Sequence, residues 1–165
     1  MDLQAAIQHV KLRDFSVARS SGIGGCHDAI EFAKIRQINA VGNLNYEVIV
    51  GKSLEEVEEI VILKKTSHPT IPGIKQIEYK IPALDSKLKT TGALRGDGAK
   101  NFTKTTYDPA IWTDIKLNKA LKEAIQDAAN KNGGILKREW NGLTSNGYTM
   151  RGYFDNDKIT SFFFE

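Results

Sequence analysis

The chain has 165 residues, of which 41% are hydrophobic and 26% are charged, so it has the composition of one folded domain rather than of a disordered segment. Its 23 basic and 20 acidic residues give a net charge of +3, which is compatible with a nucleic-acid ligand but too small to indicate one. The single cysteine, Cys26, excludes an internal disulfide framework and a cysteine-rich zinc module.

Two kinds of targeting segment are not expected. No uncharged apolar run approaches the roughly 18 residues that a membrane span needs. The first ten residues, MDLQAAIQHV, lack the basic start and the apolar block of a signal peptide. We therefore expect a single domain over residues 1–165, which reaches the outside of a cell only if something beyond this segment carries it.

The first third of the chain predicts two short helices with a turn between them. Residues 3–10 have Leu3, Ile7 and Val10 on one face, and residues 20–25 (SSGIGG) predict a flexible turn. A second helical pattern follows Gly24 and Gly25, with apolar residues at helical spacing: Ile30, Ala33 and Ile35. His27 is then expected at or near a helix N-terminus, where unpaired backbone N–H groups favour an anion.

The middle of the chain predicts strands. Residues 46–50 are β-branched, residues 60–63 (IVIL) resemble a strand, and residues 53–59 fit either a helix or a strand. Strands are also predicted at 74–81, after a turn at Pro69 and Pro72, and at 102–107, because both segments alternate in polarity. Between these two strands, residues 85–100 (DSKLKTTGALRGDGAK) predict a loop with three glycines and four basic side chains.

The last part predicts one long helix and then three strands. The helix begins after Thr113, runs for about 16–18 residues and ends at Gly133 and Gly134. Its expected buried stripe consists of Ile115, Ala120, Leu121, Ala124, Ile125 and Ala128. Strand signals follow at 135–140, 147–154 and 158–164. Helices at the N-terminus followed mainly by strands predict an α+β fold with antiparallel sheets.

The chain offers few groups for chemistry. It has three histidines, no HExxH motif, no cysteine or histidine spacing suited to zinc, and no glycine-rich phosphate-binding signature. We therefore expect no metal and no cofactor. His68 lies in a Ser-His-Pro-Thr turn and is interpreted as a surface or hydrogen-bonded side chain.

Two histidines and a lysine suffice for one reaction, the cleavage of RNA by its own 2′-hydroxyl. One imidazole serves as base and another as acid near neutral pH, because the usual pKa of histidine is about 6.5. A lysine stabilises the charge on the phosphoryl oxygens. DNA lacks the internal nucleophile, so such a site would spare it.

Several blocks of the sequence resemble one family. The stretch HVKLRDF…GIGGCH is similar to the paired-histidine signature of the EndoU endoribonucleases. The later blocks HPTIPGIKQIEYKIPALD, FTKTTYDP and SNGYTMRGYFDNDKITSFFF resemble the bacterial branch of that family in the same order. The resemblance runs from about residue 9 to the C-terminus, with weak cover over residues 36–60, and it implies an EndoU-like (RNase A-like) fold.

The resemblance also implies roles for individual residues. It makes His9 the general acid and His27 the general base on the 2′-hydroxyl. The family's lysine matches Lys104, with Lys100 as a competitor that would share its strand face. Arg13 stands where the family commonly has glycine, four residues after the first histidine.

The family's last strand carries Ser or Thr, any residue, and then an aromatic. Ser161 and Phe163 match these positions, so the resemblance implies that Ser161 reads a uracil edge and that Phe163 stacks on the base or sugar. Lys100 and Thr106 complete the expected substrate-binding set. Two other interpretations stay open: Phe163 could belong to the core, and Lys104 could be a solvated strand charge.

The activity implied is metal-independent RNA cleavage that leaves a 2′,3′-cyclic phosphate and a 5′-hydroxyl. Bacterial members of the family are commonly the toxin tips of contact-dependent growth-inhibition and related systems. The resemblance therefore implies a monomeric toxin domain that is delivered as part of a larger secreted or surface protein. It would act on RNA, such as tRNA, in the cytoplasm of a target bacterium, and an immunity protein would inhibit it in its producer. The alternatives are a non-catalytic RNA-binding module of the same fold and a DNase.

Overall fold

In the computed structural model, the described residues are 3–17, 21–39, 59–95 and 101–165. The helices are α1 (Gln4–Lys11), α2 (Ala29–Ala33) and α3 (Asp114–Asn130). The strands before α3 are β1 (Arg13–Asp14), β2 (Gly24–Gly25), β3 (Gln37–Asn39), β4 (Ile60–Ser67), β5 (Ile74–Lys80), β6 (Pro82–Leu84), β7 (Thr90–Leu94) and β8 (Phe102–Tyr107). Those after it are β9 (Glu139–Leu143), β10 (Thr149–Asp155) and β11 (Lys158–Phe164).

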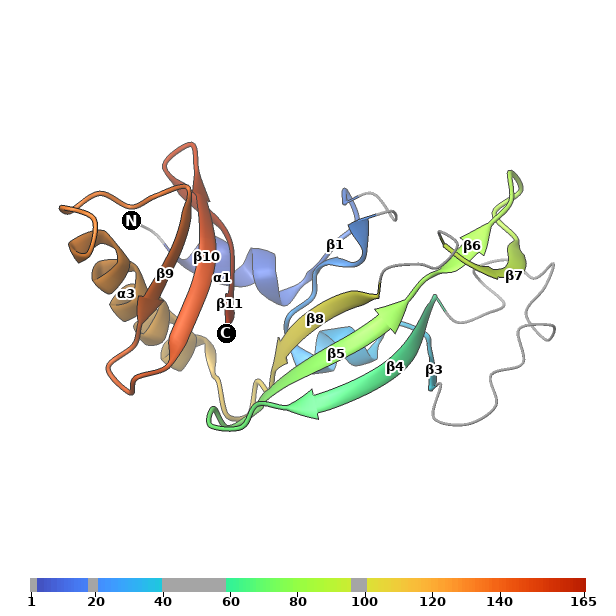
Figure 1. Ribbon diagram of the computed structural model, residues 1–165, viewed down its shortest axis with the longest axis horizontal. Helices are drawn as coiled ribbons and strands as arrows, with labels where there is room; N and C mark the ends of the chain where they lie inside the picture. Colours follow the sequence, from blue (N-terminus) through green and yellow to red (C-terminus); the bar gives the residue numbers. More distant parts are fainter. Residues whose placement is uncertain (1–2, 18–20, 40–58, 96–100) are drawn as a thin grey trace.

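The elements form two groups that meet at β8 and β11 (Figure 1). One group contains the antiparallel sheet β11-β10-β9, with α3 packed against β9 and β10 and α1 against β11. The other contains the sheet β3-β4-β5-β8 and the hairpin β6-β7. The predicted α+β class is confirmed, although β3 and β4 pair in parallel, contrary to the expected purely antiparallel sheets.

Each group has its own core. The first core joins α1, α3 and the three-stranded sheet, and Ile7, Leu117 and Met150 are fully buried in it. The second joins α2 to β4 and β5 through Phe32, Ile60 and Tyr79. The ends of β8 and β11 lie between the two cores, so packing in both cores restrains their positions.

Local sequence signals explain most element ends. Asp28 caps α2 by accepting hydrogen bonds from the backbone N–H groups of Ile30 and Glu31. Thr113 caps α3 in the same way through Lys116, and Gly133 and Gly134 follow the helix with positive φ. The predictions for 3–10, for the long helix and for strands 74–81, 102–107 and 158–164 are thus confirmed to within a few residues.

Several other predictions were wrong. Residues 90–94 of the predicted loop pair with 82–84 as a hairpin, Gly24 and Gly25 form β2 rather than a free turn, and the strand predicted at 135–140 begins only at Glu139. In α2 the expected face is rotated, because Ile30 is exposed while Phe32 is buried. In α3 the expected stripe is confirmed except at its start, where Ile115 is exposed and Leu117 is buried instead. Tertiary packing, rather than helical period alone, selected the buried face.

The segments predicted at 46–50 and 53–58, and Lys100, lie outside the described residues. Across the part of the chain that is described, no helix has the length and apolar character to cross a membrane.

Candidate active site

The glycine-rich turn is fixed to the end of α1 and brings two histidine-bearing segments together. The backbone N–H of Cys26 donates to the Leu12 carbonyl at 2.9 Å, and that of His27 donates to the Val10 carbonyl at 2.8 Å. Gly25 has a φ of 58°, and a Cβ there would strike the Leu12 and His9 carbonyl oxygens. Only glycine allows this approach, so the Gly-Gly-Cys-His order places His27 beside the helix that carries His9.

The ring of His27 is held by the backbone of β8. Its Nδ1 atom lies 2.6 Å from the carbonyl oxygen of Thr105. A carbonyl only accepts hydrogen bonds, so Nδ1 carries the proton and the neutral ring keeps its lone pair on Nε2. The His27 carbonyl in turn accepts from the Tyr107 N–H at 2.8 Å. The bond to Thr105 leaves Nε2 as the nitrogen that can take a proton, and the backbone bond to Tyr107 holds the residue against β8.

The surroundings of His27 favour the neutral ring. Burial lowers the pKa of His27 to about 3, and the nearby positive charge of Lys104 adds to this effect. A charge on His9 has the same direction and a smaller effect, while the hydrogen bond to Thr105 opposes it. The imidazole is therefore uncharged at neutral pH, as a proton acceptor must be.

Lys104 is buried, so it is not a solvated strand charge, which was one of the two interpretations left open by the sequence. Its Nζ donates to the carbonyl oxygens of Ile23 at 2.7 Å and Gly25 at 2.6 Å. Burial lowers the pKa of Lys104 to about 8. The ammonium thus anchors the glycine-rich turn and contributes positive charge next to His27.

His9 occupies a different environment. Its side chain is 51% exposed, and its Nε2 lies 3.8 Å from the Oδ2 atom of Asp14. Hydrogen bonds from Ser16 hold that carboxylate and lower the pKa of Asp14. A protonated His9 therefore has an anionic partner. The two histidines therefore have different surroundings: His9 is exposed and next to a carboxylate, whereas His27 is part-buried with a neutral ring.

The last strand places its aromatic residues as the alternation predicts. Phe162 and Phe164 are buried in the first core, whereas Ser161 and Phe163 are only partly buried. The ring of Phe163 lies parallel to that of His27, with 6.2 Å between ring centroids and 5° between planes. Thr106 is buried, with only 2% of its surface exposed, and it lines a small cavity together with His27 and Phe163. The structure thus brings Phe163 and Thr106 to His27.

Across the described residues, no three histidine, cysteine or acidic side chains are grouped so that they could hold a metal ion. His68 matches its interpretation as a hydrogen-bonded turn residue. Its Nδ1 accepts from the N–H groups of Thr70 and Ile71, and its Nε2 donates to the carbonyl oxygen of Glu165 at 2.9 Å.

Comparison with known proteins decides the family. Residues 6–164 match the family described as bacterial EndoU nuclease. The chain belongs to the bacterial EndoU nuclease family. The family resemblance carried by the paired histidines is therefore confirmed.

This EndoU chain is also similar to a curated relative, the tRNA nuclease CdiA of Escherichia coli (strain STEC_O31). The two are 31% identical over 146 residues, which covers 78% of the chain. The chain spans only 4% of the length of that relative.

Two contacts of the EndoU site were missed by the sequence argument. The Thr105 carbonyl sets the tautomer of His27, and the Asp14 carboxylate faces His9. The first is a backbone contact, which side-chain identity cannot reveal. The second depends on the short pairing of β1 with β2, which fixes the backbone after α1.

Proposed function

We propose that residues 1–165 form one metal-independent nuclease toxin domain that cleaves tRNA by attack of a ribose 2′-hydroxyl on the adjacent phosphate. The products are a 2′,3′-cyclic phosphate and a 5′-hydroxyl. The observation that carries this proposal is the hydrogen bond from His27 Nδ1 to the Thr105 carbonyl, because it leaves Nε2 unprotonated and available as a base.

The proposed reaction is one proton-balanced displacement. His27 Nε2 takes the proton of the 2′-hydroxyl while the 2′-oxygen bonds to phosphorus. The bond between phosphorus and the 5′-oxygen breaks, and His9 gives that oxygen a proton. The phosphodiester charge next to His27 favours its protonated form, which offsets the lowered pKa of the free ring.

The remaining residues bind and stabilise. Lys104 has three N–H donors, of which two bind carbonyl oxygens, so the third can serve a phosphoryl oxygen. Ser161 reads the base of the cleaved nucleotide, and the partly exposed ring of Phe163 stacks on it. Thr106 lines the small cavity beside His27 and Phe163. Lys100 and the other basic residues of segment 85–100 add contacts to RNA phosphates. Phenylalanine has no hydroxyl to donate, so base choice rests on Ser161.

The test is to incubate the purified chain with total RNA in excess EDTA and to map the new ends. We expect cleavage that survives chelation, with cyclic-phosphate and 5′-hydroxyl ends enriched in tRNA. Complete loss with EDTA, restored by one divalent ion, would contradict the metal-independent mechanism. Ends with 5′-phosphates would contradict transesterification.

We further propose that the domain is a monomer carried by a larger secreted or surface protein, and that it acts in the cytoplasm of a target bacterium. The similarity to CdiA supports this. A producer of such a nuclease needs an immunity protein. We expect an acidic inhibitor to cover the surface around His9, His27 and Lys104, because complementary charge speeds association. Growth should stop when the chain is expressed alone and recover when the neighbouring gene is co-expressed. Tolerance of high levels of the active chain would contradict the toxin role but not the nuclease role.

A further inference from the structure

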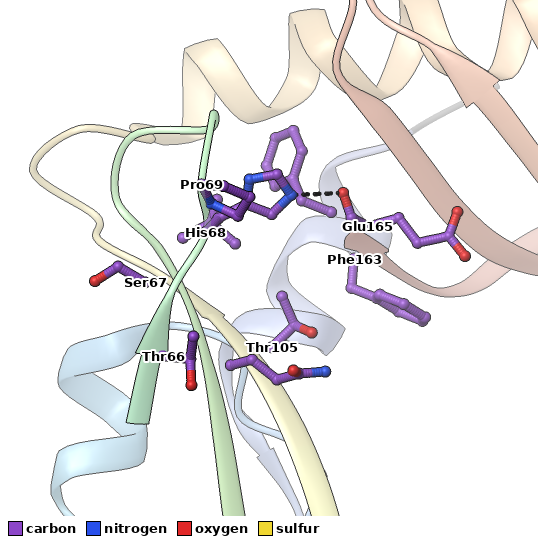
Figure 2. Close-up of a pocket in the computed structure, with 10 residues that line it drawn as sticks. Thr66, Ser67, His68, Pro69, Thr105, Phe163 and Glu165 are labelled. Atoms are coloured by element: carbon purple, nitrogen blue, oxygen red, sulfur yellow. Dashed lines mark hydrogen bonds between the residues drawn. The ribbon is translucent and has the colours of Figure 1, made fainter. Parts of the chain in front are cut away.

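A pocket of about 230 Å³, shown in Figure 2, is lined by Thr105, Phe163 and Glu165 among others and adjoins the His27 site. Two of its lining residues also contact His27: Thr105 through its carbonyl oxygen and Phe163 through its parallel ring. The pocket is close to the lower end of the range for ligand sites, so it suits one ring-sized group. Because it shares two residues with His27, any group in it lies within about one nucleotide of the reacting atoms.

The pocket has a polar floor built by the sheet. Thr66 on β4 is directly opposite Gln76 on β5, and Gln76 is directly opposite Thr105 on β8. Side chains opposite one another in a sheet share a face, so these three form one row. Thr66 and Gln76 are exposed, and all three line the pocket. The row therefore offers two hydroxyls and one amide to a bound group.

The chemistry of the pocket suits a nucleobase better than a phosphate. No lysine or arginine is found among the described residues that line it. Glu165 also lines the pocket, and its carboxylate pairs with Arg151 at 3.5 Å. Both ring nitrogens of His68 already have backbone partners, since its Nδ1 accepts two N–H groups and its Nε2 donates to Glu165. Proteins recognise a base by stacking an aromatic ring on its face and by hydrogen bonding to its edge. Here Phe163 can stack, and the amide and hydroxyls can bind the edge.

A second pocket indicates the direction in which a bound RNA would run. It lies at the other end of β11 and is lined by His9, Lys158 and Thr160. Thr160 is an extra residue of β11, because Ser161 pairs with Tyr153 and Ile159 pairs with the next residue, Phe154. We call the pocket lined by His9, Lys158 and Thr160 the His9 pocket, and the one lined by Gln76 and Thr66 the Gln76 pocket. Along β11 the order is thus the His9 pocket, Ser161, Phe163 and the Gln76 pocket. His9, as the acid, faces the leaving nucleotide on the 3′ side, so the Gln76 pocket is on the 5′ side.

We propose that Gln76 and Thr66 bind the base immediately 5′ to the cleaved nucleotide, with the ring of Phe163 between that base and the base of the cleaved nucleotide. RNA then lies along β11 with its 5′ side toward Glu165. This inference rests on the proposed acid and base roles of His9 and His27. It makes the 5′ neighbour a second determinant of where the enzyme cuts.

The test uses DNA oligonucleotides that contain one ribonucleotide, because cleavage is then confined to one bond. The base 5′ or 3′ to that ribonucleotide is varied among the four bases and an abasic position. The variants are Gln76→Leu and Thr66→Val, and the matched control is Thr103→Val, an exposed threonine on the same face outside the pocket. Melting temperatures verify that all three fold.

With the native chain, we expect an abasic 5′ neighbour to lower the cleavage rate roughly tenfold or more, the scale of one lost stacked base. Gln76→Leu and Thr66→Val should reduce the differences among 5′ bases, and Thr103→Val should leave them unchanged. Indifference of the native chain to the 5′ base, an effect of Gln76→Leu confined to the 3′ base, or an equal effect of Thr103→Val would each overturn the proposal. A native chain that cuts neither these substrates nor an all-RNA strand would instead contradict the proposed function.

Discussion

The Nδ1 atom of His27 and the carbonyl oxygen of Thr105 are 2.6 Å apart, although 78 positions separate the two residues in the chain. This contact selects the tautomer in which Nε2 is free. It also joins the glycine-rich turn to the edge of the sheet β3-β4-β5-β8, so the base and the sheet that supports it keep a fixed geometry.

Removal of either histidine should abolish most of the cleavage. We expect His9→Ala and His27→Ala each to lower the rate by at least ~100-fold, the usual scale for a general acid or base. Rates on a defined RNA, with circular dichroism to verify folding, provide the measurement. Lys122→Ala is the control, since this exposed residue of α3 lies outside both pockets along β11. Full activity in a folded His9 or His27 variant would remove that residue from the mechanism.

The stability of the fold should fall as the pH falls from about 6.5 toward 3. His27 stays neutral in the folded chain, because its pKa is lowered to about 3, whereas the unfolded chain takes up the proton near pH 6.5. The slope from this group is at most about 1.4 kcal/mol per pH unit. Urea unfolding between pH 4.5 and 7 measures it. His27→Gln should flatten the slope. An equal slope in native chain and His27→Gln would contradict the assigned pKa.

Loss of Lys104 should destabilise the glycine-rich turn. In Lys104→Met the carbonyls of Ile23 and Gly25 lose their donor, at about 1–3 kcal/mol for each group left unsatisfied. The free energy of unfolding provides the measurement, and Lys75→Met, an exposed lysine on β5, provides the control. An unchanged free energy of unfolding in Lys104→Met would contradict this anchoring role.

Cleavage by the native chain should also decline above about pH 8. Burial lowers the pKa of Lys104 to about 8, so its positive charge is lost as the pH rises through that value. Rates on an intact RNA between pH 6.5 and 9.5 measure this decline. In Lys104→Arg the charge persists over this range, so any remaining activity should not fall there. A native rate that stays level to pH 9.5 would remove this charge from the mechanism.

Neighbouring phenylalanines of β11 should behave in opposite ways. Phe163→Ala should slow cleavage roughly ten- to a hundredfold with a modest loss of stability, because base stacking on an aromatic ring is worth about 1–3 kcal/mol. Phe162→Ala should cost about 3–5 kcal/mol of stability, since that ring lies in the core. Ser161→Ala should relax base choice more than it slows cleavage. Melting temperatures and cleavage-site sequencing for the three variants test this, and a reversed pattern for the phenylalanines would place the site on the other face of β11.

Local signals in the sequence determined several elements and their faces. Residues 158–164 were predicted to be a strand, in which successive residues point to opposite faces. This alternation was sufficient to place Phe162 and Phe164 in the core and Phe163 outside it. Thr113 and Gly133 marked the ends of the long helix through capping. The paired histidines identified the family without any structure.

Only the tertiary structure decided how these parts meet. Nothing near Lys104 in the sequence shows that its ammonium binds the carbonyls of Ile23 and Gly25, about 80 residues earlier. The alternation of 102–107 predicts a strand, and it left open whether Lys104 was solvated. Likewise, the exposed Ile30 and Ile115 fit a helical stripe as well as buried residues do, so the neighbours present in the fold chose the face. Hydrogen bonds and packing between distant segments leave no local period, which is why sequence patterns predicted the elements and the structure decided the site.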